Sequence, residues 1–456
     1  MKALLLRRFS AALVLFLLGV VLALFLVPRE LEQMRWEVPG MPESYPFEQL
    51  CRPIFLFLLS FLPFIGALVY GFMGTMDRYL SRTFINYFLL CTLILMVIYT
   101  LADFTANMEK FRTRFDNPLL ESFVFYGTQL PMFLYQILPY TLLMGTLWCL
   151  SRLSATSELT GMLQSGRSLL RLCRPIFFFS TLVALAYGIF GFHWAPNGYL
   201  YRQIMLKEQP VEDGHEPPLV YRSDAESRIW RVTRPASFAD PGRPMEEVTI
   251  EQFDPEHHGK LVRQYIARSA TWNKRDATWV LRDVFVRDLS HAPDAQPQDE
   301  QYHDVLVCAF DEKPYQIISP STGGRVDSMG TSAMYEFIAS GSGSREDRRN
   351  YRTEWHVRIA RIFSCLVLVL LAVPSAVTFQ RRGAMKGIGI AILLAALMLF
   401  LYRVFPSLGA SGLLPAWLSA WLPNLIYTGV ALYLFRVNLA HRSFREWLSA
   451  RLNGRP

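Results

Sequence analysis

The chain has 456 residues, of which 52% are hydrophobic and only 18% are charged, and its formal net charge is +8. About 25% of the residues in ordinary globular proteins are charged, and the apolar residues of this chain gather in charge-free runs about as long as the ~20 residues that cross a bilayer. These totals exclude an ordinary soluble protein and predict a polytopic membrane protein. The basic excess is then typical of short cytoplasmic loops, so no nucleic-acid partner is predicted.

Two membrane spans are predicted near the N-terminus. The uncharged run 11–27 follows Lys2, Arg7 and Arg8, and a second apolar run covers residues 53–74. A signal peptide is the alternative interpretation of the first run, but no A-x-A-like cleavage site follows it, which favours an uncleaved helix. The loop between the two runs is acidic, as expected of an external loop.

Three further spans are predicted at residues 83–102, 122–151 and 175–195. The middle run is free of charge and contains Pro131 and Pro139, which indicates one long kinked span or a span with an interfacial shoulder. After the last of these runs the composition of the chain changes from apolar to mixed.

A short polar stretch, residues 154–177, joins the second and third of these runs. Thr156 or Ser157 is a candidate helix cap, and Glu158 then lies in the first turn, where a negative charge suits the helix dipole. An amphipathic helix between two spans predicts a docking surface for a soluble partner, and the alternative is a loop that returns the chain to the bilayer. Three apolar residues spaced i, i+3 and i+4 share one face of this helix: Leu159, Met162 and Leu163.

Residues 196–350 have the pattern of an inserted β domain. Apolar and polar residues alternate in five runs broken by Pro, Gly, Asp and Asn, which indicates antiparallel strands, and about 150 residues are enough to bury a core. The polar end of this region, residues 340–350, is predicted to be a flexible joint. The five runs begin at Arg228, Glu247, Leu261, Trp279 and Asp304.

Three spans close the chain, at residues 362–379, 387–402 and about 416–435. The turn 380–386 and the tail 437–456 are short and basic, so both are predicted to be cytoplasmic. Counting back from them gives eight spans, with both termini in the cytoplasm and the β domain outside.

The motifs of enzymes are missing from the sequence. It has no G-x-x-x-x-G-K-[ST] loop for ATP and no G-x-S-x-G elbow, and the adjacent His257 and His258 have no third metal ligand near them. The six cysteines lack metal-binding spacing and are interpreted as small buried hydrophobes rather than a disulfide framework. No catalytic residue, cofactor or metal site is therefore predicted.

Basic residues recur near the outer ends of the predicted spans. Arg358 and Arg361 are three apart and share one helix face. For any single residue the favoured interpretation is an anchor that snorkels to the interface. The alternative is a basic rim for an anionic amphiphile, because arginine pairs strongly with phosphate. The candidates for such a rim are Lys110, Arg112, Arg114, Arg358, Arg361 and Arg403.

Several short stretches, in this order and spacing, carry a family resemblance. They are DRYLSRTF from Asp77, SELTGMLQSG from Ser157, WAP from Trp194, EWHVR from Glu354, LAVP from Leu371, RRG from Arg381, GIGI from Gly387 and LPN from Leu422. Together they resemble the lipopolysaccharide-export permeases of the LptF/LptG family (YjgP/YjgQ), over roughly residues 76–436. Family members generally begin near the equivalent of Met76, so residues 1–75 depart from the pattern.

The resemblance implies a permease subunit of an ABC transporter in the bacterial inner membrane. Two such permeases would pair and take lipopolysaccharide from the membrane, and an LptB-like ATPase dimer would dock beneath them. Residues 154–171 would be the coupling helix, with Glu158 as the coupling acid beside Leu159, Met162 and Leu163. The β domain would pass lipid to an LptC/LptA-like periplasmic bridge. A membrane-anchored scaffold or sensor of envelope components is the alternative.

The predicted fold class is a polytopic α-helical membrane protein with an inserted extracytoplasmic all-β, jelly-roll-like domain. Its parts are an N-terminal extension with two spans, a first group of three spans with the coupling helix, the β domain, a second group of three spans and a basic cytoplasmic tail. Their predicted bounds are residues 1–75, 76–195, 196–350, 351–436 and 437–456.

Overall fold

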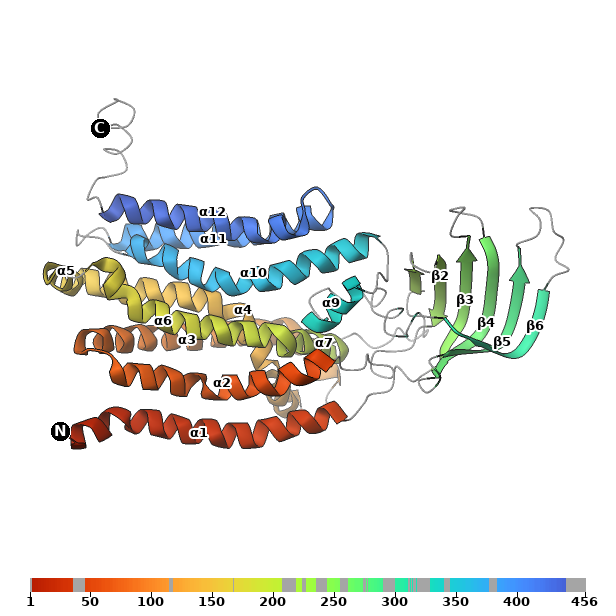
Figure 1. Cartoon of the computed structure of the whole chain (residues 1–456), viewed down its shortest axis with the longest axis horizontal. Helices are drawn as coiled ribbons and strands as arrows, with labels where there is room; N and C mark the ends of the chain where they lie inside the picture. Colours follow the sequence, from red (N-terminus) through yellow and green to blue (C-terminus); the bar gives the residue numbers. More distant parts are fainter. Residues whose placement is uncertain are drawn as a thin grey trace, which may run out of the picture. The chain divides into compact units, whose positions relative to one another are not determined.

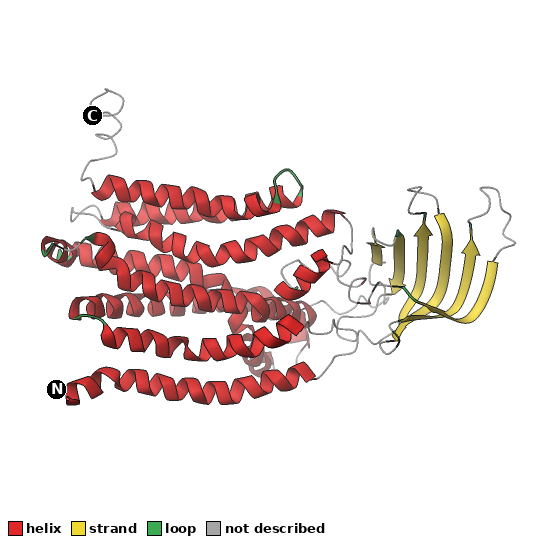
Figure 2. Cartoon of the chain, in the orientation of Figure 1, coloured by secondary structure: helices red, strands yellow, loops and turns green. Residues whose placement is uncertain are grey.

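A computed structural model of the chain shows a helical bundle and one β-sheet (Figures 1 and 2). Two compact units divide the chain, one formed by Met1–Pro28, Pro53–Ala195 and His356–Pro456, the other by Arg29–Arg52 and Pro196–Trp355. The structure describes residues 2–35, 46–114, 118–166, 168–206, 219–223, 227–234, 244–254, 261–273, 276, 278–289, 300–310, 312, 314, 317, 329–339, 345–376 and 384–439.

Seven of the described helices are long and apolar enough to cross a membrane, and an eighth apolar segment, Ala396–Ala410, is shorter. The chain is therefore a multi-pass membrane protein, as predicted. The seven helices are α1 (Lys2–Arg35), α2 (Pro46–Phe72), α3 (Thr75–Arg114), α4 (Pro118–Ala155), α6 (Leu169–Ile189), α10 (Arg345–Ala376) and α12 (Ala416–Leu439), and the shorter segment belongs to α11 (Ala384–Ala410).

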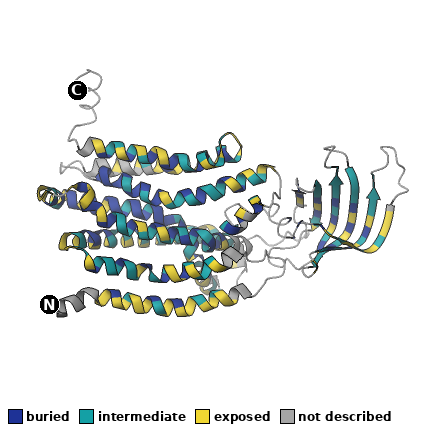
Figure 3. Ribbon diagram, viewed as in Figure 1, coloured by how far each residue is buried: buried dark blue, intermediate teal, exposed yellow. Residues whose placement is uncertain are grey.

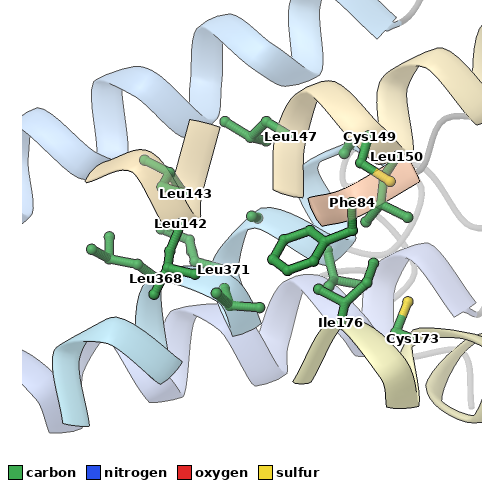
Figure 4. Close-up of a cluster of buried hydrophobic side chains, with 14 of the residues drawn as sticks. Phe84, Leu142, Leu143, Leu147, Cys149, Leu150, Cys173, Ile176, Leu368 and Leu371 are labelled. Atoms are coloured by element: carbon green, nitrogen blue, oxygen red, sulfur yellow. The ribbon is translucent and has the colours of Figure 1, made fainter. Parts of the chain in front are cut away.

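Burial separates central helices from peripheral ones (Figure 3). In α4, 72% of the most apolar part is buried, against 11% in α1 and 11% in α3. The exposed apolar residues of α1 and α3 are those expected to face lipid, because hydrocarbon solvates them as well as protein does. Side chains from four helices meet in the core around α4 (Figure 4): Phe84, Leu142, Leu147, Ile176 and Leu368.

The long helices α3 and α4 form an antiparallel pair that is in contact along its length. They approach each other closely at Gly145, where a β-carbon would lie 2.9 Å from the Cα atom of Phe88. Only a residue without a side chain allows the two backbones to come this close. Other contacts along the pair join Tyr87 to Trp148, Tyr99 to Phe133 and Asp103 to Tyr126.

The two N-terminal helices pack against each other and then against α6. Phe16 of α1 lies against Phe61 of α2, with ring centroids 5.8 Å apart. A β-carbon on Gly66 of α2 would lie 3.3 Å from the ring of Phe179 in α6. The helix pair formed by α1 and α2 is thus an integral part of the bundle.

A π-helix, η1 (Phe190–Trp194), follows α6 and leads into α7 (Ala195–Leu206). Side chains of two other helices pack against it. Gly191 lies so close to Tyr135 of α4 that a β-carbon on it would be 2.5 Å from the ring. The ring of Phe192 contacts Phe55 of α2 edge-on, with centroids 5.0 Å apart. Short π-helical turns recur at functional sites. Neither η1 nor α7 was predicted from the sequence.

Six strands form one antiparallel sheet, which confirms the predicted inserted β domain. The five alternating runs correspond to the strands β2 to β6, whereas the strand β1 was not predicted. The described strands pair in chain order, and the finer prediction of a jelly-roll-like domain stays a prediction. The strands are β1 (Leu219–Ser223), β2 (Arg228–Arg234), β3 (Met245–Phe253), β4 (Leu261–Asn273), β5 (Thr278–Asp288) and β6 (Glu300–Cys308).

Two residues with positive φ interrupt the alternation along the strands, Glu247 at 55° in β3 and Asp283 at 52° in β5. In β3 the buried residues on either side, Met245 and Val248, are three positions apart instead of two. The irregularity shifts which face of the strand is buried, as a β-bulge does. The sheet is curved in Figure 1.

An aromatic core fills one face of the sheet, and residues after β6 close it. The rings of Trp230 and Trp279 lie 5.0 Å apart, and the indole Nε1 of Trp279 donates a hydrogen bond to the carbonyl of Glu312 at 2.6 Å. Arg228 pairs with the Glu312 carboxylate at 2.8 Å, with side-chain exposures of 11% and 3%. Paired and hydrogen-bonded, these charges can be buried.

The six cysteines are free thiols. Cys308, in β6, packs against the sheet core, and burial raises the pKa of its thiol to about 11. Its thiol should therefore react slowly with iodoacetamide at pH 8, where only about a thousandth is thiolate, and about tenfold faster per pH unit up to pH 11. Quantifying the alkylated peptide by mass spectrometry checks this, and labelling at pH 8 as fast as that of a free cysteine peptide would contradict it.

The prediction of a flexible joint at residues 340–350 is wrong for residues 345–350. Residues 345–350 form the first turns of α10, with Glu346 and Asp347 placed where negative charge suits the helix dipole, and residues 340–344 lie outside the described part of the chain. A further helix that was not predicted, α9 (Thr331–Ala339), packs Phe337 against Tyr351 with ring centroids 4.6 Å apart.

Candidate functional site

The polar stretch between α4 and α6 is shorter as a helix than predicted. Residues 154–171 are divided among the end of α4, the seven-residue helix α5 (Glu158–Gln164) and the start of α6. Ser157 occupies the cap position with φ of 62°, but its side chain makes no capping hydrogen bond. Gly166 ends the segment with φ of 84°, a conformation that glycine adopts without strain. Figure 1 shows α5 at one end of the bundle.

The apolar face of α5 points into the bundle. Leu159 is only 2% exposed, Met162 is also buried, and both belong to the same core as Leu80 of α3. Leu163 is half-buried against that core, whereas Gly161 and Gln164 are exposed. Leu159, Met162 and Leu163 thus share one face of α5, as predicted, and this face packs against the helical bundle of the same chain. The exposed side of α5 is the polar one.

Both carboxylate oxygens of Glu158 accept hydrogen bonds. The hydroxyl of Tyr79, in the first turns of α3, donates to Oε2 at 2.7 Å, and the hydroxyl of Thr156 donates to Oε1 at 3.0 Å. Hydrogen bonds to an ionised carboxylate are stronger than those between neutral groups. Glu158 is half-buried, so its carboxylate is held in a defined position while part of it remains accessible.

Other contacts bring the ends of four helices together around α5. Arg152, near the end of α4, donates to the hydroxyl of Tyr87 in α3 at 3.2 Å. The hydroxyl of Ser154 donates to the carbonyl of Ala376, the last residue of α10, at 3.3 Å. The start of α3, the end of α4, the start of α6 and the end of α10 therefore meet at the same end of the bundle, as the predicted alternation of spans requires.

The candidate basic residues differ in exposure. Arg403 and Arg112 are exposed, Arg361 and Lys110 are half-buried, and Arg358 is only 7% exposed. The side chain of Arg114, at the end of α3, is outside the described part of the structure. Exposure alone therefore makes Arg403 and Arg112 the most accessible cations of the set.

Two of these cations lie at the same level of the bundle. Arg361 follows Ala360 and Arg403 follows Tyr402, and both of those residues hydrogen-bond to the amide of Asn424 in α12. Arg361 on α10 and Arg403 on α11 therefore come from helices that are joined at this level.

A polar junction next to these arginines was missed by the sequence analysis. The amide of Asn424, in α12, is buried; its Nδ2 donates to the carbonyl of Ala360 at 2.7 Å, and its Oδ1 accepts a hydrogen bond from the hydroxyl of Tyr402. These bonds join α10, α11 and α12. The available signal was an amide within an apolar span, which is uncommon unless it is paired with another helix.

Another polar residue without a predicted role is Gln129 of α4. Its side chain is fully buried, and neither its oxygen nor its nitrogen has a hydrogen-bond partner among the described residues. The described residues contain no group of three or more His, Cys, Asp or Glu side chains able to hold a metal ion. His257 and His258, the pair considered in the sequence, lie outside the described residues.

Comparison with known proteins identifies a family. A family model described as "Lipopolysaccharide export system permease LptF/LptG" matches residues 78–437. The matched region begins in α3 and ends in α12, so it contains α5, the sheet and all six candidate cations, but neither α1 nor α2. No curated protein matches the chain.

Proposed function

Because the chain belongs to the LptF/LptG family of lipopolysaccharide export permeases, we propose that it is the permease subunit of an ABC transporter that extracts lipopolysaccharide from the inner membrane. The observation that carries the proposal is the family match across both the bundle and the sheet. A family of transport permeases is not a family of enzymes, and the missing phosphate loop agrees with hydrolysis by a separate chain.

An LptB-like ATPase dimer would dock at α5. The polar side of α5 is exposed, and the burial of Leu159 and Met162 fixes the helix to the bundle, so a push on α5 would be transmitted rather than absorbed. Glu158 would meet a basic residue of the ATPase as the coupling acid. Since Leu159 and Met162 face inward, we assign them to holding α5 rather than to contacting the partner.

The end of the bundle that carries α5 would face the cytoplasm. The basic turn 380–386 and the basic tail 437–456 follow helix ends assigned to that side, which supports this orientation. The β domain would then lie in the periplasm and pass lipid to an LptC/LptA-like bridge. A second permease of the same family would complete the membrane part of the transporter.

The lipid headgroup would be recognised by the cations of α10 and α11. Arg361 and Arg403 follow Ala360 and Tyr402, which both hydrogen-bond to Asn424, and two guanidinium groups at one level of the bundle would suit a phosphorylated headgroup. Arg403 is exposed, so it would be the first contact. Arg358 is buried, and we assign it a supporting place behind this pair.

A photocrosslinking amino acid at position 403 is expected to capture lipopolysaccharide, because Arg403 is exposed and lies at the same level of the bundle as Arg361. Position 436 is the matched control: Arg436 is an exposed arginine at the C-terminal end of α12, which would lie on the cytoplasmic side. Immunoblotting for the crosslinked lipid reads the result. Equal capture at both positions, or none at position 403, would contradict the headgroup assignment.

Purification of the intact complex from native membranes tests the function as a whole. An ATPase subunit should co-purify with the chain, and mass spectrometry should find lipopolysaccharide bound. A chain that retains envelope components but never an ATPase would instead be the membrane-anchored scaffold or sensor.

A further inference from the structure

The helix α5 is covalently continuous with α4 and α6 but not with α3. Only two residues lie between Ala155 and Glu158, and the segment from Gln164 to Leu169 is similarly short. Any displacement of α5 therefore reaches α4 and α6 through the chain itself. It reaches α3 indirectly, through the packing of α3 against α4, and directly through side-chain contacts between α5 and α3.

Side-chain contacts are also what keep α5 in place. A helix of seven residues has little stability of its own, and Ser157 gives it no side-chain cap. Two attachments to α3 can be named among the described residues: the apolar core shared by Leu159 and Leu80, and the 2.7 Å hydrogen bond from Tyr79 to Glu158. The apolar attachment can slide, whereas a hydrogen bond to a carboxylate is directional.

The helix α3 extends far from this attachment. It is one helix of 40 residues, so at ~1.5 Å per residue Lys110 lies about 46 Å along the axis from Tyr79. Its close backbone contact with α4 at Gly145 keeps the two helices from separating. A displacement applied at Tyr79 would thus be carried to the end of α3 that holds Lys110 and Arg112.

We propose that Tyr79 is the positioning residue that joins Glu158 to α3 and so carries the displacement of α5 into that helix. The inference rests on the proposed function, since it needs a partner that moves α5. A carboxylate offers about four acceptor positions, and Tyr79 and Thr156 occupy two. Glu158 can therefore be held from α3 and gripped by a partner's cation at the same time.

The test is Tyr79→Phe in the complete complex, reconstituted with its ATPase and lipopolysaccharide in liposomes. Tyr79 is 42% exposed, so loss of its hydroxyl should leave the thermal stability and the bound ATPase unchanged. ATP hydrolysis should continue, while lipopolysaccharide released per ATP falls about tenfold, the scale of a lost hydrogen bond to a charged group. A merely structural role would lower stability without changing this ratio.

Three comparisons sharpen the result. Tyr70→Phe on α2, whose hydroxyl makes no hydrogen bond among the described residues, should match the wild type. Thr156→Val removes the bond to the other oxygen of Glu158 but leaves the link to α3, and should cost much less than Tyr79→Phe. The double variant Tyr79→Phe with Glu158→Ala should be no worse than Glu158→Ala alone, because Glu158→Ala already removes the acceptor of the Tyr79 hydrogen bond.

The outcomes separate the inference from the function on which it rests. If the wild-type complex couples ATP hydrolysis to lipid release, and the Tyr79→Phe complex releases as much lipid per ATP, the role of Tyr79 is overturned but the proposed function is not. A wild-type complex without an ATPase, or without lipid release, counts against the proposed function. If Tyr79→Phe does not accumulate, Glu158→Ala replaces it, because it removes the acceptor of the same hydrogen bond. Co-purification of the ATPase then shows whether docking or transmission has failed.

Discussion

Glu158→Arg is expected to abolish lipopolysaccharide export while the chain still folds and inserts. The side chain is half-buried at the end of the bundle, and α5 keeps its buried Leu159 and Met162, so an arginine can be accommodated. A cation at this place would face the basic residue expected of the ATPase, and like charges at an interface cost several kcal/mol. Export in a depletion strain and ATP hydrolysis by the purified complex are the measurements.

Gly161→Ala is the matched control for this substitution. It lies on the exposed side of the same short helix, and a β-carbon there would meet no atom within 4 Å. A methyl group there adds no charge, so this variant should leave membrane insertion unchanged and lower export far less than Glu158→Arg does. Export at the wild-type level by Glu158→Arg would remove the coupling role of Glu158. Restored export when the ATPase receives a compensating acidic residue would confirm the contact directly.

Gly145→Leu is expected to destabilise the helical bundle strongly. The β-carbon of residue 145 would lie 2.9 Å from the Cα atom of Phe88, and a backbone atom cannot rotate away as a side chain can. The two helices would have to separate, and overpacking of this kind costs about 1–3 kcal/mol or more. Thermal unfolding of the purified chain in detergent, followed by tryptophan fluorescence, should show a clear fall in Tm.

Gly127→Leu tests whether this effect is specific. Gly127 lies on the same helix, α4, but a β-carbon at this position would have no atom within 4 Å. The change should alter the stability by no more than about 0.5 kcal/mol, as is usual away from tight contacts. Equal losses of stability in the two variants would show that leucine is harmful throughout α4 and that the contact at Gly145 is not the cause.

The spans and most strands could be predicted because each has a simple period or length. The strands β2 to β6 alternate, and the spans are runs of apolar residues without charge. The parts that were missed break these rules. The strand β1 is only five residues long, and Glu247 interrupts the alternation of β3 with its positive φ. The charged residues 345–350 resemble a linker, although a helix that continues out of a membrane carries the same composition.

The candidate site was predictable in part. Spacing alone placed Leu159 and Met162 on one face of a helix, but it could not decide whether that face meets a partner or the chain's own core. The hydrogen bond between Tyr79 and Glu158 joins residues 79 positions apart, so no local sequence pattern predicts it. Asn424 belongs to the LPN stretch of the family resemblance, but its hydrogen bond with Tyr402 depends on the packing of α11 against α12, which the sequence does not predict.

The packing of α1 and α2 has a consequence for the order in which the protein is made. Their docking surface includes Phe179 in α6 and Phe192 in η1, which leave the ribosome more than a hundred residues after α2. At about 5–20 residues per second, that delay is on the order of ten seconds. During this interval the two helices must persist in the bilayer as a preformed hairpin, held by contacts such as Phe16 with Phe61.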